Sequence, residues 1–254
     1  MTAADGFNVV FAAIPRSPTL RHIWRAVYGS DYPEGADPFS FVTLTDLRRI
    51  AAELRIGVQE TMVDLACGRG GPGLWIANLT GASLVGVDFS EVAIEQAEQR
   101  AVQLGLSGRA RFLVRDAVAT GLPDASLDGA MSIDSFWLFA DKLQVATEVA
   151  RILRSGRRFV VTTWEFETSP PGWPPQLTQH RDLLYEAGFV VEVDDETVDW
   201  KTRQLAVYAE ILAAQAILTA ELGEAAAAQM ITEARDVPAL LEHSRRVLVV
   251  ARRQ

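Results

Sequence analysis

The chain has 254 residues, of which 49% are hydrophobic and 22% are charged, as is typical of a globular protein with a well-buried core. The net charge of −9 argues against nucleic acid as a partner, because its phosphates would be repelled. No apolar run reaches the length of a membrane span, and no basic leader precedes the apolar patch at Val9–Ile14. We therefore expect a cytoplasmic protein. Its single cysteine, Cys67, excludes an intrachain disulfide and a zinc site, and we interpret it as a packing residue.

The first 57 residues are predicted to form a helical lid. Residues 1–16 read as a loose or partner-dependent tail. Ser17 and the proline after it then predict an N-cap and the first turn of a helix, which continues with apolar residues at helical spacing. A second helix is expected to begin near Leu44 and to end at Gly57.

The stretch Met62–Ala77 follows the lid and organises the rest of the chain. It begins as an apolar run ending in Asp64, passes through four glycines, and continues with the apolar periodicity of a helix. A strand, a tight glycine turn and a helix start form the ligand-binding corner of a doubly wound α/β sheet. We therefore predict an α/β fold of this type.

Two kinds of cofactor bind at such a corner. Gly68-x-Gly70-x-x-Gly73 matches the dinucleotide fingerprint, and Asp88 follows at the separation expected of a ribose-binding acid. Asp64 discriminates between the two, because a carboxylate there would repel a pyrophosphate. The same carboxylate suits a cofactor that has no phosphates and a positively charged head.

Strands and helices alternate along the remainder of the chain. The predicted strands are Thr61–Ala66, Ser83–Asp88, Ala110–Arg115, Gly129–Ile133, Arg157–Trp164, Phe189–Val193 and Val247–Ala251. About fifty residues separate the last two. They are predicted to form a long helix over Trp200–Leu222, a second over Glu224–Ala234, and a short third from Pro238.

The glycine corner resembles the first motif of the class I S-adenosylmethionine-dependent methyltransferases, an acid followed by glycines two, four and six residues later. Here it reads Asp64-x-Ala66-x-Gly68-x-Gly70, with alanine in place of the first glycine, which should narrow the turn only slightly. The resemblance covers most of Thr61–Arg252. It implies a mostly parallel, seven-stranded, Rossmann-like sheet. It also implies S-adenosyl-L-methionine as cofactor and S-adenosyl-L-homocysteine as product.

The resemblance also assigns cofactor contacts to the ends of successive strands. Asp88 would bind the ribose hydroxyls, Phe89 would lie against the adenine, and Asp116 would accept from the adenine amino group. Because strand ends in an open parallel sheet share one edge, Asp64, Asp88 and Asp116 should converge on one crevice. The predicted cofactor contacts are Asp64, Ala66, Gly68, Gly70, Asp88, Phe89, Asp116, Ala117 and Ile133.

In the same family, N-terminal helices and the loop after the fourth strand lie beside the methyl acceptor. The predicted pocket residues are Tyr28, Tyr32, Trp137 and Trp164, the tyrosines because they carry polar tips. Trp24 and Phe41 are equally well explained by core packing. His180 follows a stiff proline-rich loop and is the candidate base, although a structural histidine is the competing interpretation. Asp134 could also orient or deprotonate an acceptor, although the favoured interpretation is that it caps the next element.

We predict a core over residues 58–198 and 245–254, with 199–244 as a cap or as a dimerisation element of a homodimer. The implied reaction is in-line transfer of a methyl group to O, N or C of a small organic acceptor, of secondary-metabolite type. Two alternatives remain open. One is an enzyme that binds the cofactor but catalyses a cyclisation or rearrangement. The other is a non-catalytic ligand-binding or partner protein.

Overall fold

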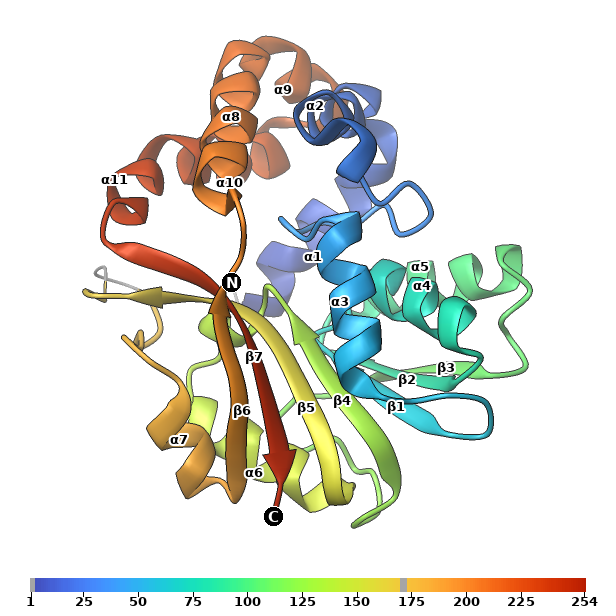
Figure 1. Ribbon diagram of the computed structural model, residues 1–254. Coiled ribbons are helices and arrows are strands. Elements are labelled where there is room, and N and C mark those ends of the chain that lie inside the picture. The colour runs from blue at the N-terminus through green and yellow to red at the C-terminus, as the bar shows by residue number, and fades with distance from the viewer. Residues whose placement is uncertain (1–2, 170–172) are drawn as a thin grey trace.

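The computed structural model describes residues 3–169 and 173–254, and its centre is one seven-stranded sheet (Figure 1). The strands run in the order β3-β2-β1-β4-β5-β7-β6, with only β7 antiparallel to its neighbours. The predicted sheet is therefore confirmed. The strands are β1 (Thr61–Leu65), β2 (Ser83–Asp88), β3 (Ala110–Val114), β4 (Leu127–Ile133), β5 (Leu153–Phe166), β6 (Phe189–Glu196) and β7 (Ser244–Arg253).

Helices cover both faces of this sheet, as in a doubly wound fold. On one face lie α3 (Leu44–Leu54), α4 (Gly71–Thr80) and α5 (Glu91–Gln103), and on the other lie α6 (Lys142–Ile152) and α7 (Arg181–Glu186). Successive strand residues alternate between the two cores. Met62 and Met131 pack towards α3 and α4, whereas Val63 and Ala130 pack towards α6. Burial on both faces explains why these strands are continuous apolar runs.

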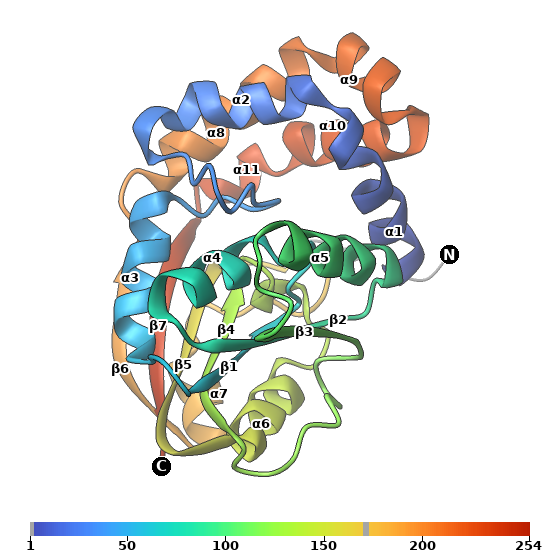
Figure 2. The same cartoon turned by 90° about the vertical axis from the view of Figure 1, so that its right-hand side faces the viewer.

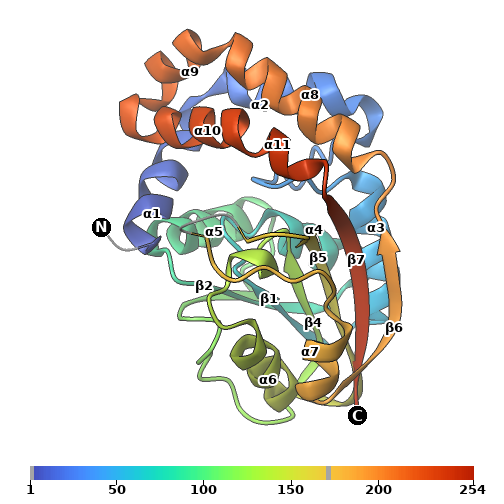
Figure 3. The same ribbon diagram turned by 90° about the vertical axis from the view of Figure 1, so that its left-hand side faces the viewer.

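A helical cap built from two distant parts of the chain lies over one edge of the sheet (Figures 2 and 3). Its helices are α1 (Ala3–Ala13), α2 (Pro18–Tyr28), α8 (Trp200–Ala213), α9 (Gln215–Leu222), α10 (Glu224–Asp236) and α11 (Pro238–Leu241). They share one apolar core. At the junction, Glu221 accepts hydrogen bonds from the hydroxyls of Ser17 and Thr19, at 2.5 and 2.7 Å.

The N-terminal residues depart from the prediction of a loose tail. They form α1 and the short helical turn Ile14–Arg16, because Val10 and Phe11 are buried in the cap core. Polar contacts also fix α1 to α5. The amide of Gln96 donates to the Phe11 carbonyl at 2.9 Å, and Ser90 donates to Asn8 at 2.5 Å.

Two helix ends also differ from prediction. The helix expected to end at Gly57 stops two residues earlier, where Arg55 takes the left-handed conformation (φ 51°). The predicted long helix over Trp200–Leu222 is two helices, α8 and α9, bent by 78° after Ala213. The bend turns the apolar side chains of both helices into the same cap core, a tertiary effect that leaves no glycine or proline signal in the sequence.

No single helix among the described residues is long and apolar enough to cross a membrane. The bent pair α8 and α9 meets the length and composition criteria only when the two are counted together.

Candidate functional site

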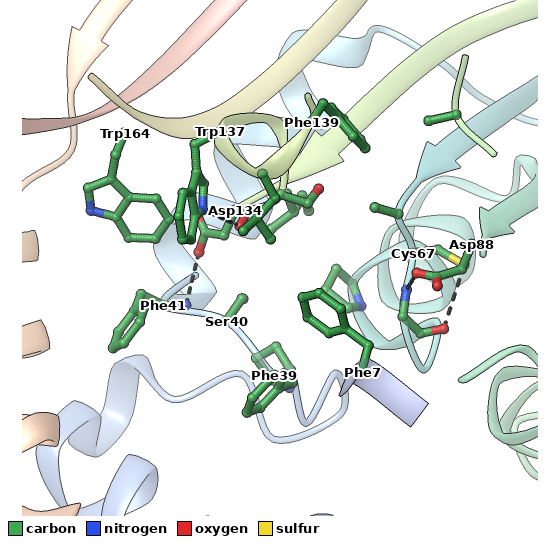
Figure 4. A pocket seen from close by; sticks show the side chains of 18 of the residues that line it. Phe7, Phe39, Ser40, Phe41, Cys67, Asp88, Asp134, Trp137, Phe139 and Trp164 are labelled. Carbon is green, nitrogen blue, oxygen red and sulfur yellow. Dashed lines mark hydrogen bonds between the residues drawn. The ribbon is translucent and has the colours of Figure 1, made fainter. Parts of the chain in front are cut away.

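A cavity of about 890 Å³ lies between the carboxyl ends of the strands and the cap. Figure 4 shows Cys67 and Asp88 at one end and the rings of Phe41, Trp137 and Trp164 at the other. The cavity is therefore lined by residues of the glycine corner on one side and by aromatic residues on the other.

The glycine corner turns through three residues in the left-handed conformation, Ala66 (φ 53°), Gly68 (φ 51°) and Gly70 (φ 73°). An alanine in this conformation costs about 1–2 kcal/mol, so the departure at Ala66 strains the backbone rather than merely narrowing the turn. Gly70 does not line the cavity. A Cβ there would lie 3.0 Å from Ala97 and Phe112, so this glycine serves the turn and its packing. The other eight predicted cofactor contacts line the cavity.

Asp64 is buried at the end of β1 and accepts a hydrogen bond from the backbone N–H of Gly73. A Cβ on Gly73 would lie only 2.7 Å from its Oδ2, which explains the need for glycine in this turn of α4. Burial, and then the nearby charge of Asp88, raise the pKa of Asp64 well above its usual value. None of the ion pairs between described residues includes Asp64. A cationic ligand would supply the missing partner.

The carboxylate of Asp88 accepts hydrogen bonds from the backbone of the glycine corner and of the residues that follow β2. Its Oδ2 accepts from the N–H of Gly68 at 2.8 Å, and its Oδ1 accepts from the N–H of Ser90 at 2.9 Å. Burial raises the pKa of Asp88, and these backbone bonds oppose that effect. Each carboxylate oxygen has two lone pairs, so both remain able to accept from a ligand hydroxyl.

The third acid, Asp116, lies two residues beyond the end of β3 and accepts from the N–H of Val118 at 3.1 Å. Phe89 directly follows β2 and is 37% exposed, with its ring 5.7 Å from that of Phe7 on α1. Asp64, Asp88 and Asp116 line the same cavity, so the predicted convergence of three strand ends is observed.

Asp134 lines the cavity, but its carboxylate is occupied by the protein. Arg246 on β7, which is fully buried, donates to it through Nε and Nη2 at 3.0 and 3.1 Å. The N–H of Phe41 donates to the same carboxylate at 2.9 Å. Arg246 also donates to Asp46 at 3.0 Å and to Thr197 at 3.0 Å. Asp134 therefore anchors the aromatic wall, and the geometry does not favour it as a base.

His180 is misplaced by the sequence prediction. It is 1% exposed, outside the cavity lining, with Nδ1 3.3 Å from Oε1 of Glu165 and its ring 5.7 Å from that of Phe136. The reason is that α7, which begins after it, packs in the core on the α6 face of the sheet. Neither His22 nor His243 lines the cavity, so no described histidine is placed to act as a base there.

The two tyrosines proposed for the pocket are also outside the lining. Tyr28 donates to the Phe41 carbonyl at 3.1 Å, and Tyr32 donates to Asp37 at 2.9 Å. Their polar tips therefore hold the loop before α3. The residues that line the cavity from this region include Trp24 and Phe41, which the sequence left undecided between pocket and core.

Trp137 and Trp164 line the cavity as expected, with their rings 6.0 Å apart. Their role in binding an acceptor stays a prediction. The cap adds three polar side chains that the sequence analysis did not single out, Gln204, Tyr208 and Glu233. Nothing in their spacing distinguishes them from the polar residues of an ordinary helix face.

Lys142, the first residue of α6, connects the loop after β4 to the loop after β5. It is buried and donates to the carbonyls of Phe139 at 2.9 Å and Pro175 at 2.6 Å, and burial lowers its pKa to about 8. In the unfolded chain the lysine pKa is about 10.4. Between these values the unfolded chain binds more protons, so stability due to this group rises with pH and is lost as pH falls through about 8.

We expect the stability of wild type relative to Lys142→Met to increase by about 1–3 kcal/mol from pH 7 to pH 10. Urea unfolding of both proteins at each pH measures this. If the free energies of unfolding of the two proteins changed with pH in parallel, Lys142 would have an ordinary pKa.

The fold and the cavity define a doubly wound α/β protein with a cavity at the carboxyl ends of its strands, where proteins of this architecture bind their ligands. Residues 62–156 match a family model described as a methyltransferase domain. The solved structure titled as the [4+2]-cyclase SpnF has a TM-score of 0.73 and 22% identity, covering 82% of this chain and 79% of that one. Over this part of the sheet, the chain is thus similar to methyltransferases.

Among curated relatives, 27-O-demethylrifamycin SV methyltransferase of Amycolatopsis mediterranei is 29% identical over 152 residues, 60% of this chain and 55% of the relative. Methyltransferase GfsG of Streptomyces halstedii is 31% identical over 129 residues, 51% of this chain and 46% of the relative. The chain thus aligns with about half the length of these curated relatives.

Proposed function

We propose that this protein is an S-adenosylmethionine-dependent methyltransferase that acts on a small organic acceptor. The observation that carries the proposal is the meeting of Asp64, Asp88 and Asp116, from three successive strands, in one cavity that also has an aromatic wall. The relatives named above, which are methyltransferases by name, support the same activity. One of them is named for a rifamycin substrate, which favours an acceptor of secondary-metabolite type.

The residues present fit this cofactor. Asp64, which lacks a protein cation among the described ion pairs, would hold the ammonium group of the amino-acid portion. Asp88 would accept from the ribose hydroxyls, Phe89 would cover the adenine, and Asp116 would accept from its amino group. A dinucleotide fits poorly, because its pyrophosphate would approach the buried carboxylate of Asp64.

The bound cofactor would supply an electrophilic methyl group carried on a sulfonium. The chain's own residues hold the acceptor and exclude water. Phe41, Trp137 and Trp164 give the acceptor rigid apolar walls, and Arg246 fixes Phe41 through Asp134. Holding two reactants in line removes much of the entropic part of the barrier. Since the described histidines are outside the cavity, we infer that positioning contributes more than a histidine base.

A second candidate function is cyclisation or rearrangement of a substrate with the cofactor bound. The aromatic cavity, whose lining contains no described histidine, suits such a reaction, and the [4+2]-cyclase named above has a similar fold. We rank it below methyl transfer, because likeness at 22% identity extends to the fold alone.

The deciding experiment incubates the purified protein with S-adenosylmethionine labelled at the methyl group and an extract of candidate acceptors. Methyl transfer gives a labelled product together with S-adenosylhomocysteine. A changed substrate without label selects the second candidate. Cofactor binding without any turnover selects a non-catalytic ligand-binding protein, and absence of cofactor binding rejects both enzyme candidates.

Asp88→Ala should weaken S-adenosylmethionine binding about 10- to 100-fold, because it removes hydrogen bonds to a charged acceptor. His180→Ala should leave the affinity within about twofold, although loss of a buried ring lowers stability. Calorimetric titration, below the melting temperature of each variant, measures both. Equal losses of affinity in the two variants would contradict this placement of the cofactor.

For the segment 199–244 we propose the role of a cap over the acceptor. Its helices α8 and α10 supply Gln204, Tyr208 and Glu233 to the cavity lining. Packing of α8 against α2 and of α10 against α1 supports this role. The alternative role in a homodimer stays a prediction that the molecular mass in solution would test.

A further inference from the structure

The cap lines the cavity mainly with apolar side chains, but one row of polar groups crosses it. Nε1 of Trp164 donates to Oε1 of Gln204 at 3.2 Å. Nε2 of Gln204 donates to the hydroxyl of Tyr208 at 2.9 Å, and that hydroxyl donates to Oε1 of Glu233 at 2.8 Å. All four side chains line the cavity.

The direction of this row is fixed by chemistry. The indole N–H of Trp164 can only donate, so Gln204 must present its carbonyl oxygen to it and its amide nitrogen to Tyr208. The Tyr208 oxygen therefore accepts, and its single hydrogen is directed to Glu233. The row begins at a donor and ends at an acceptor.

Glu233 has unused accepting capacity at that end. Its Oε2 takes part in none of the hydrogen bonds between described residues, and none of their ion pairs includes this carboxylate. Met230, Val237 and Leu241 are apolar parts of the same wall. The Glu233 side chain is exposed and lines the cavity, so this oxygen is accessible to a ligand.

Aromatic rings surround the approach to this row. The ring of Phe41 lies 5.5 Å from that of Tyr208, 6.0 Å from that of Trp164 and 5.9 Å from that of Trp24, and all of them line the cavity. A ligand that reaches Glu233 would therefore be apolar over most of its surface.

We propose that the cap end of the cavity is the acceptor subsite, and that Glu233 binds a hydroxyl or amino group carried by an otherwise apolar acceptor. The proposal rests on the proposed function, because an acceptor is the second ligand that the cavity would hold beside the cofactor. It adds a requirement on the acceptor, which is a hydrogen-bond donor on an apolar body. It assigns to Glu233 the selection of that donor.

Three probes of similar size test this requirement. They are 2-naphthol, which carries an O–H donor, 2-naphthylmethanamine, which carries an ammonium donor, and 2-methoxynaphthalene, which carries none. Equilibrium dialysis at pH 8 against the full-length protein, with and without saturating S-adenosylhomocysteine, gives the affinity of each. We expect at least one donor probe to bind at least about tenfold more tightly than the methyl ether. The order of the two donor probes tells whether a hydroxyl or an ammonium group is preferred.

The variant Glu233→Gln should reduce this preference to less than about threefold, because a neutral amide is a weaker acceptor than a carboxylate. Glu224→Gln, the same change at an exposed position of α10 outside the cavity, should retain it. Unchanged S-adenosylhomocysteine binding by Glu233→Gln shows that the variant is folded. Equal binding of the three probes, no binding of any, or an unchanged preference in Glu233→Gln overturns the proposal. Failure of the proposed function would appear separately, as wild type that does not bind S-adenosylhomocysteine.

Discussion

Asp64→Asn is expected to make the ligand-free protein more stable and to abolish most of its affinity for S-adenosylmethionine. The carboxylate is buried beside Asp88 and is in none of the ion pairs between described residues, so its charge costs stability until a cation binds. Removing the charge should increase the free energy of unfolding by about 1–2 kcal/mol, or the melting temperature by about 2–8 °C. The loss of the partner for the cofactor ammonium should weaken binding at least about 100-fold.

The pH dependence gives this prediction a second readout. Burial raises the pKa of Asp64 in the folded protein above its unfolded value of about 3.9. The folded state then binds more protons in the window above about pH 3.9, so wild type loses stability there as pH rises. The advantage of Asp64→Asn should accordingly be larger at pH 8 than at pH 5.

Thermal melts at both pH values and calorimetric titration of the cofactor measure these effects. Asp116→Asn is the matched control, because it makes the same change at an exposed acid of the same cavity. It should leave the melting temperature within about 2 °C. A destabilised Asp64→Asn that binds the cofactor like wild type would contradict our assignment.

Arg246→Met is expected to destabilise the protein by about 3–5 kcal/mol, since it would leave the carboxylates of Asp46 and Asp134 buried without their partner. Arg246 is fully buried and connects β7 to α3 and to the loop after β4, and its guanidinium lies 5.6 Å from the Trp164 ring. The loss should also release Phe41, whose N–H is bound by Asp134.

The rescue variant separates lost charge balance from lost packing. Arg246→Met combined with Asp46→Asn and Asp134→Asn removes the two uncompensated charges, so most of the stability should return. Urea unfolding of the single and triple variants measures this. A triple variant as unstable as the single one would show that the arginine acts through packing alone.

The sequence was sufficient to predict the sheet and the meeting of the three aspartates in one cavity, because both follow from local patterns. Apolar runs of strand length defined all seven strands to within a few residues at most ends. Acids placed just after parallel strands must meet at one edge, which is why Asp64, Asp88 and Asp116 could be brought together without a structure.

The aromatic and cap side of the cavity could not be predicted, because it depends on which distant segments pack together. Nothing in the sequence singled out Arg246, which is buried against acids 112 and 200 residues away in the chain. His180 was assigned to the ligand edge from its neighbouring prolines, but α7 carries it into the opposite core. Tyr28 and Tyr32 were chosen for their hydroxyls, which the loop before α3 uses internally.

The two sides of the cavity come from separate stretches of the chain. The helices α8 and α10 carry Gln204, Tyr208 and Glu233, whereas the strand ends carry the three aspartates. If the proposed function holds, substitutions in the insertion would change the acceptor that is bound and leave the contacts proposed for the cofactor unchanged. Exchanging residues 199–244 between homologues, with the sheet domain kept the same, is therefore the natural way to change which acceptors are bound.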